Sequence, residues 1–224
     1  GSSLLHSEFG VEGATNLKTI EACTSEAARW PPVRDNLTWW HTGAWWIREP
    51  VLDEVFGGLP PDLPAFVRLT QFLQATGLQY AVEADRRRWH NTPHGPVRRN
   101  SGTLPWQLNE PFPNLFCTSA VDYFAEPKPA YYAVARAYRP HTITASFDNQ
   151  AWAGREAFEA RIRLCGNAAA SGETVVEARL CGMDGTVWAS QVWTATPVDA
   201  PDLRSAGHGG SEEGPAEPAA TTSR

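Results

Sequence analysis

The composition of this chain of 224 residues bounds its fold and its partners. With 42% hydrophobic residues, the chain can bury a core as one large domain or as two small ones. Its net charge of −6 argues against binding to nucleic acid, which requires a basic surface. The sequence contains no run of about 18 apolar residues, so we expect no segment that spans a membrane.

Tryptophan and cysteine are informative residue types here. The chain has ten tryptophans, and because indole rings are costly to leave in water, we expect them in a core or stacked on a ligand such as the flat face of a sugar. The four cysteines lie far apart, without a CxxC motif or the spacing of metal ligands, which indicates free thiols or small buried residues and no metal site.

The ends of the chain suggest a piece of a longer protein. The sole methionine is Met183 and the first residue is Gly1, so we expect that translation starts upstream. The chain shows no signal peptide, which slightly favours a cytoplasmic over a secreted protein.

Residues 4–9 predict a short strand that carries one carboxylate. Leu4 and Leu5 are expected at its buried end, and Gly10 ends it. Glu8 would then stand at the rim of the sheet, where the loops of a parallel α/β barrel surround a shared pocket. Next, residues 17–21 predict a short helix.

The aromatic segment 39–46 follows, with Trp40 and His41 in a long loop or short helix near the pocket. His41 could be a substrate ligand or a hydrogen-bonded packing residue. From 63 to 89 apolar residues recur with the period of a helix, with Glu83 and Asp85 off the apolar face. Arg86 to Arg88 fall near its end, where cations complement the helix dipole.

The strand and helix pattern then repeats before the period changes. Residues 102–108 predict a strand and 129–138 a helix, so the first 140 residues contain two successive βα units. Beyond Pro140, alternation predicts four antiparallel strands (142–147, 158–164, 173–181 and 186–193), the last two forming a hairpin around residues 183–185. Four strands are fewer than a complete immunoglobulin-like sandwich needs. From Asp199 the composition predicts a disordered tail.

Six blocks of the sequence resemble, in order and spacing, the end of glycoside hydrolase family 2, and among its branches the β-mannosidases. The blocks are residues 7–10, 17–20, 83–87, 102–109, 119–123 and 127–132. The resemblance implies an α/β plus all-β architecture: the end of a (β/α)8 barrel over 1–140, a partial immunoglobulin-like β-sandwich over 141–198, and the tail over 199–224. It also implies a retaining exo-β-glycosidase that needs no cofactor.

The resemblance assigns roles to single residues. Glu8 matches the catalytic nucleophile at the end of the seventh barrel strand, and Trp106 matches the tryptophan in the floor of the sugar pocket. Gln107 and Asn109 match positions close to that pocket. Glu110 sits in an Asn-Glu-Pro sequence that imitates the family's acid/base motif, but it follows the nucleophile by about a hundred residues. We therefore expect Glu110 at the pocket rim or in a structural role, and the acid/base outside this chain.

Alternative functions remain open from the sequence. The parent protein could be another family 2 enzyme, such as an exo-β-glucosaminidase, β-glucuronidase or β-galactosidase. The chain could also be a non-catalytic module that binds carbohydrate through its tryptophans. Because two βα units cannot close a barrel, we expect the 224 residues alone to be inactive without the rest of the parent polypeptide.

Overall fold

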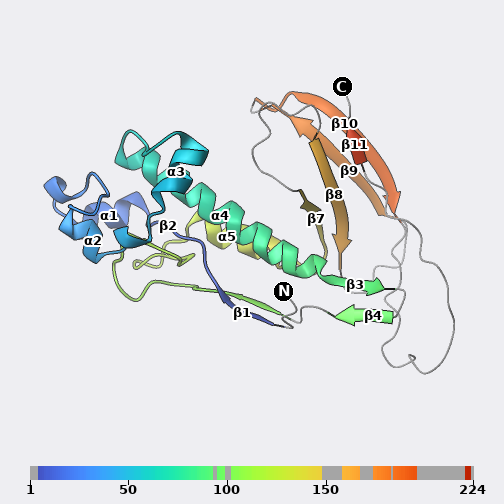
Figure 1. The fold of residues 1–224 in the computed structure, drawn as a ribbon, viewed down its shortest axis with the longest axis horizontal. Helices are drawn as coiled ribbons and strands as arrows, with labels where there is room; N and C mark the ends of the chain where they lie inside the picture. The colour runs from blue at the N-terminus through green and yellow to red at the C-terminus, as the bar shows by residue number, and fades with distance from the viewer. Residues whose placement is uncertain are drawn as a thin grey trace.

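The computed structural model describes residues 5–92, 95–98, 102–147, 158–166, 174–182, 184–195 and 220–222. A helical part contains α1 to α5 with several short strands, and a separate group of strands contains β7 to β11 (Figure 1). The two groups meet at the carboxyl end of α4. There the Tyr80 hydroxyl donates to the Phe147 carbonyl at 3.2 Å, and the Arg163 guanidinium donates to the Arg87 carbonyl at 3.0 Å.

The long helix α4 (Leu63–Arg87) is the predicted helix, and it forms for the expected reasons. The Asp62 carboxylate caps it by accepting a hydrogen bond from the Ala65 amide at 2.7 Å. At the other end, Arg86 donates to the carbonyl oxygens of Ala137 and Arg139. Arg86 therefore binds carbonyl groups at the end of the neighbouring helix over residues 129–137. The hairpin of β3 (Trp89–Thr92) and β4 (Gly95–Arg98) follows it.

The carboxyl-terminal turns of α4 correct one expectation. Glu83 and Asp85 were expected off the buried face, yet they are only 9% and 7% exposed. Each carboxylate is buried because it has a partner. Glu83 pairs with Arg87 at 3.7 Å, and Asp85 accepts from His6 Nδ1 at 2.8 Å.

Two parallel strands form the base of the helical part. β1 (His6–Phe9) pairs with β5 (Thr103–Pro105), with His6 opposite Thr103 and Phe9 opposite Pro105. β1 leads on to α4, and β5 leads on to α5 (Pro129–Ala137), which packs along α4 (Figure 1). The structure thus contains the two predicted strand-to-helix units. Leu5, expected to be buried, is 46% exposed because this sheet has two strands in the described residues and leaves its side chain partly uncovered.

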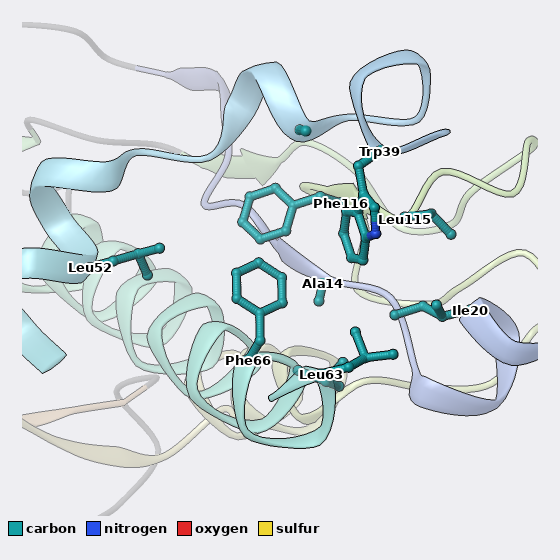
Figure 2. Close-up of a cluster of buried hydrophobic side chains, with 10 residues drawn as sticks. Ala14, Ile20, Trp39, Leu52, Leu63, Phe66, Leu115 and Phe116 are labelled. Carbon is teal, nitrogen blue, oxygen red and sulfur yellow. The ribbon is translucent and has the colours of Figure 1, made fainter. Parts of the chain in front are cut away.

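The amino-terminal end of α4 packs against short elements to form the main core. These elements are β2 (Gly13–Ala14), α1 (Leu17–Cys23), η1 (Glu26–Ala28), α2 (Leu37–His41), η2 (Ala44–Trp46), α3 (Glu49–Phe56) and β6 (Phe116–Cys117). Trp39 and Phe66 are fully buried and meet edge to face, with ring centroids 5.7 Å apart (Figure 2). Gly43 is required beside them, because its φ is +118° and a Cβ there would lie 1.9 Å from the Phe116 oxygen.

The β-rich part contains the four predicted strands and one more. β7 (Thr142–Ser146) pairs antiparallel with β8 (Phe158–Cys165), and β9 (Thr174–Cys181) forms a hairpin with β10 (Val187–Ala195). Met183, in the expected turn, lies outside the described residues. The hairpin exposes large apolar side chains: Val175 and Trp188 are 65% and 68% exposed.

The tail differs in one short segment from the expected disorder. Ala220–Thr222 form β11, which pairs antiparallel with residues 158–160 of β8. β11 pairs with the edge of β8 that lies opposite β7, so β8 is the central strand of a three-stranded sheet. The remaining residues after Ala195 lie outside the described part of the chain.

Candidate functional site

Glu8 is presented by the end of β1. Its side chain is exposed, whereas the neighbouring His6 and Phe9 are half-buried and stack on one another with ring centroids 4.3 Å apart. His6 also binds Asp85 of α4, which fixes the strand against that helix. The carboxylate of Glu8 is therefore exposed near the end of a strand whose His6 and Phe9 side chains are held in place.

Trp106 follows β5 and lies beside the end of β1. Because β1 and β5 are parallel, their carboxyl ends lie at the same edge of the sheet, although the register shifts between His6 and Phe9. The Trp106 amide donates to the Phe9 carbonyl at 2.6 Å, which extends the pairing one step past the strand. Trp106 is 49% exposed, so its indole is available to a ligand. The structure thus places both residues that the sequence singled out at adjacent strand ends.

Gly10 permits this close approach. A Cβ at Gly10 would lie 2.8 Å from the Trp106 carbonyl oxygen and 2.7 Å from Cγ2 of Thr118. At contacts below about 3 Å a neighbouring atom must shift, and the Trp106 oxygen belongs to the backbone, which does not move easily. The glycine predicted as the end of the strand is therefore also the point at which the segments that follow Glu8 and Trp106 touch.

Residues 106–128, which we call the Trp106 loop, connect β5 to α5. Gln107 is half-buried and its carbonyl accepts from the Ala120 amide at 3.0 Å, while Asn109 is exposed and forms a parallel bridge with Val121. The loop therefore folds back on itself immediately after Trp106. This arrangement holds Gln107 and Asn109 next to Trp106, and their predicted contact with substrate stays a prediction.

Glu110 is buried inside the Trp106 loop. It is 6% exposed, and its Oε1 accepts from Asn114 at 2.8 Å. Its Oε2 accepts from Ser119 at 3.0 Å and from the Cys117 thiol. With both oxygens occupied, Glu110 does not present a carboxyl group to a substrate. Of the two readings from the sequence, the structure favours the structural one.

Lys128 lies in the same polar region, and no local pattern predicted its burial. It is 1% exposed, and its ammonium donates to the Gly13 carbonyl at 3.4 Å. Burial lowers the pKa of Lys128 to about 8, against the opposing influence of Cys117, Glu110 and Asp122. Burial likewise raises the pKa of the Cys117 thiol.

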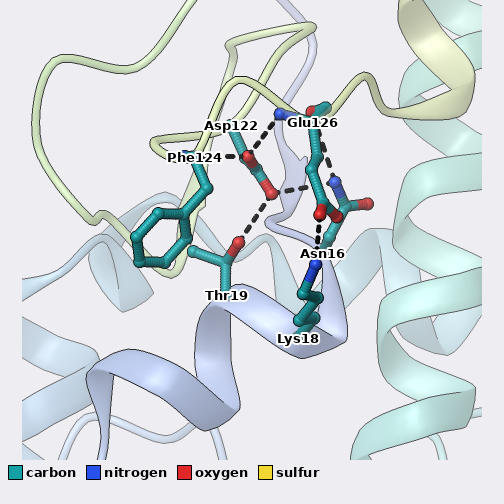
Figure 3. Close-up of polar contacts among 6 residues, drawn as sticks. All are labelled: Asn16, Lys18, Thr19, Asp122, Phe124 and Glu126. Atoms are coloured by element: carbon teal, nitrogen blue, oxygen red, sulfur yellow. Dashed lines mark hydrogen bonds and ion pairs between the residues drawn. The ribbon is translucent and has the colours of Figure 1, made fainter.

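Asp122 ties the Trp106 loop to helix α1 (Figure 3). It is 2% exposed, and its Oδ2 accepts from Asn16 at 2.8 Å and from Thr19 at 2.7 Å. Its Oδ1 accepts from the amides of Phe124 and Glu126. Lys18 and Glu126 form an exposed ion pair beside this network at 2.6 Å. The segment after β1 and the segment after β5 are therefore joined by polar contacts.

Polar side chains on the buried face of α4 support the site, and the apolar periodicity did not predict them. Gln74 is fully buried and its Nε2 donates to the carbonyl oxygens of Val11, Cys117 and Ser119. Gln71 donates to the Ala14 carbonyl at 3.2 Å. Two glutamines spaced three residues apart within an otherwise apolar stripe are a signal that could have identified this support.

The remaining predicted residues lie on α2. Trp40 is half-buried under the guanidinium of Arg34, 4.7 Å from the ring centroid, and His41 is exposed at the end of the helix. Their role in substrate binding remains a prediction.

The described residues form no metal cluster, disulfide or membrane-spanning helix. No cluster of three or more His, Cys, Asp or Glu side chains suited to a metal ion occurs among them. All four cysteines are free. None of the helices in the described ranges has the length and apolar character of a membrane span.

Comparisons with known proteins find relatives in one enzyme group. No family model matches the chain. β-Mannosidase B from Emericella nidulans is 32% identical over 150 residues, which cover 66% of this chain and 17% of the relative. β-Mannosidase B from Aspergillus flavus is 33% identical over the same share. The chain thus spans about a sixth of the length of the curated relatives it matches.

Solved structures share the fold. β-D-mannosidase from Dictyoglomus thermophilum superimposes with a TM-score of 0.57 at 22% identity, over 86% of this chain and 22% of that one. Exo-chitosanase from Amycolatopsis orientalis gives a TM-score of 0.62 at 20% identity, over 90% and 24% of the two chains. At these identities the structures show likeness of fold.

Proposed function

Because the chain is a β-mannosidase-like segment of glycoside hydrolase family 2, we propose that it is the C-terminal portion of a retaining exo-β-glycosidase that removes terminal β-linked mannose. The observation that carries the proposal is the placement of Glu8 and Trp106 at adjacent strand ends. Curated relatives named β-mannosidase B support the choice of sugar.

In this proposal the two βα units complete a barrel that begins in the parent polypeptide. β1 and β5 are the last two strands of a (β/α)8 barrel, with α4 and α5 on its outside. β7 to β10 then belong to an immunoglobulin-like sandwich. Support comes from the parallel pairing of β1 with β5, from the exposure of Leu5 and Leu104, and from the likeness to larger glycosidase structures.

The proposed mechanism uses Glu8 as the nucleophile. Its carboxylate attacks the anomeric carbon while an acid from the preceding part of the parent protonates the leaving glycosidic oxygen. The resulting glycosyl ester on Glu8 is then hydrolysed by water that the same acid/base group activates. Trp106 stacks against the apolar face of the pyranose ring. The sequence of steps requires a second carboxyl group about 5–5.5 Å from Glu8.

A second candidate differs in the sugar. A segment covering 68% of this chain is 25% identical to an Amycolatopsis orientalis exo-chitosanase, whose structure contains PNP-β-D-glucosamine, with a TM-score of 0.50. That likeness supports an exo-β-glucosaminidase as the alternative. In both cases Glu8 and Trp106 keep the same roles, because the nucleophile acts on the anomeric carbon irrespective of the substituent at C2.

The test uses the longer protein that contains this segment, assayed on a panel of nitrophenyl β-glycosides. We expect hydrolysis of the β-mannoside and a loss of about a thousandfold or more in kcat for Glu8→Gln, because the covalent step needs the carboxylate. Glu21→Gln, at an exposed position of α1, is the matched control and should retain activity. Full activity of Glu8→Gln would refute the proposal, and preference for the β-glucosaminide would select the second candidate.

The chain of 224 residues should be inactive when purified alone. Glu110, the carboxyl group in the imitation of the acid/base motif, is buried with both oxygens occupied, so it cannot serve as the partner of Glu8. Hydrolysis by this chain that depends on Glu8 would show that a second carboxyl group within it acts as the acid/base.

A further inference from the structure

The structure contains a closed circuit of contacts that joins Glu8, Trp106 and Lys128. The Trp106 amide donates to Phe9, directly after Glu8. The next residue, Gln107, accepts from the Ala120 amide at 3.0 Å, and the carbonyl of Ala120 accepts from the Lys128 amide at 2.9 Å. The ammonium of Lys128 then donates to Gly13, which lies five residues after Glu8.

Lys128 is the member of this circuit that contacts both segments. Its backbone belongs to the Trp106 loop, and its ammonium reaches the carbonyl of β2, the strand after Gly10. The titratable side chains that act on the ammonium are Cys117 of β6 and the carboxylates of Glu110 and Asp122, all in the Trp106 loop. Two buried carboxylates of one segment therefore favour the charge of an ammonium that contacts the other segment.

Holding a loop with a buried ammonium costs free energy, because the charge loses its hydration. Lys128 is 1% exposed, and desolvation opposes its charge more than the neighbouring anions favour it. An apolar side chain of similar length could fill the same space without that cost. A buried charge can define the position of one segment relative to another. Such a definition is needed here because a nucleophile and the indole ring that binds its substrate must keep a fixed geometry.

We propose that Lys128 is a positioning residue, whose buried ammonium fixes the strand end that carries Glu8 relative to the loop that carries Trp106. Its importance for catalysis rests on the proposed function. The positioning itself is a property of this chain and can be measured without any glycosidase activity.

The experiment follows the indole resonance of Trp106 and the amide resonance of Gln107 by NMR in the full chain of 224 residues between pH 6.5 and 9.5. In the wild type both signals should shift with a midpoint of about 8, where Lys128 loses its proton. Lys128→Met should abolish that transition. Lys18→Met, which removes an exposed lysine from the ion pair with Glu126, should leave the transition unchanged.

Glu110→Gln provides a second test if Lys128→Met does not fold, as judged by circular dichroism. Because the Glu110 carboxylate raises the pKa of Lys128, its removal should move the midpoint to lower pH. The proposal is overturned if neither signal titrates near pH 8, if Lys128→Met titrates like the wild type, or if Glu110→Gln leaves the midpoint in place. A failed glycoside assay with normal titrations would instead count against the proposed function alone.

Discussion

The amide nitrogen of Trp106 donates a hydrogen bond of 2.6 Å to the carbonyl oxygen of Phe9. This contact brings together two segments that are about a hundred residues apart in the sequence, and it does so one residue beyond Glu8. A carboxylate and an exposed indole therefore lie at adjacent carboxyl ends of parallel strands, and in a parallel α/β barrel this is the edge that carries the active site.

Gly10→Ala should destabilise the chain by about 1–3 kcal/mol, because the new methyl group would overlap Thr118 and the Trp106 carbonyl. Urea unfolding followed by circular dichroism measures the change. Ser7→Ala, at an exposed position of β1, is the control and should change the free energy of unfolding by less than about 0.5 kcal/mol. Equal stability of Gly10→Ala and wild type would show that these segments do not approach as closely as described.

Asp122→Asn should weaken the connection between α1 and the Trp106 loop. The buried carboxylate accepts four hydrogen bonds, two on each oxygen, and an amide can accept on one of these atoms only. We expect a loss of about 1–3 kcal/mol in the free energy of unfolding. Lys18→Met removes the adjacent exposed ion pair and should leave the unfolding midpoint almost unchanged. A larger effect of Lys18→Met than of Asp122→Asn would contradict this ranking.

Two tryptophans provide a matched comparison of core and surface. Trp39 is fully buried, packs on Phe66 and donates to the Arg29 carbonyl at 3.0 Å, whereas Trp45 is 58% exposed. Trp39→Ala should cost about 3–5 kcal/mol in thermal or urea unfolding. Trp45→Ala should lower the free energy of unfolding far less. Comparable losses in the two variants would contradict the position of Trp39 in the core.

The free energy of unfolding should depend on pH because Lys128 has a lowered pKa in the folded chain. Its pKa is about 8 in the folded chain and near the ordinary 10.5 when unfolded, so unfolding takes up a proton between these values and stability rises with pH through this window. Between pH 8 and 9 the free energy of unfolding of the wild type should rise by about 1 kcal/mol relative to Lys128→Met. The raised pKa of the Cys117 thiol acts in the opposite direction as the pH nears its ordinary value of 9.0, but Cys117 is present in both proteins, so the comparison with Lys128→Met removes most of that contribution. A flat or falling difference would contradict the burial of a charged Lys128.

Local patterns in the sequence predicted the elements well and the polar interior poorly. The apolar period and Pro129 predicted α4 and α5, and alternation predicted β7 to β10, because these elements depend on nearby residues. The burial of Lys128, Asp122 and Gln74 depends on contacts between segments up to 115 residues apart, which no local period encodes. The prediction for Leu5 was wrong in the opposite direction: Leu5 was expected to be buried and is exposed, because the described part of its sheet has two strands that leave it partly uncovered.

The role of Glu8 can be tested by trapping the covalent intermediate. In a 2-deoxy-2-fluoro-β-mannosyl fluoride, the fluorine at C2 destabilises the positive charge that develops in both steps, whereas fluoride at C1 is a good leaving group that keeps the first step fast, so the glycosyl ester accumulates. After incubation with the longer protein that contains this segment, peptide mass spectrometry should find the fluoromannosyl group on Glu8. Attachment to another carboxylate, or steady hydrolysis of a β-mannoside by Glu8→Gln, would contradict the assignment of this residue as the nucleophile.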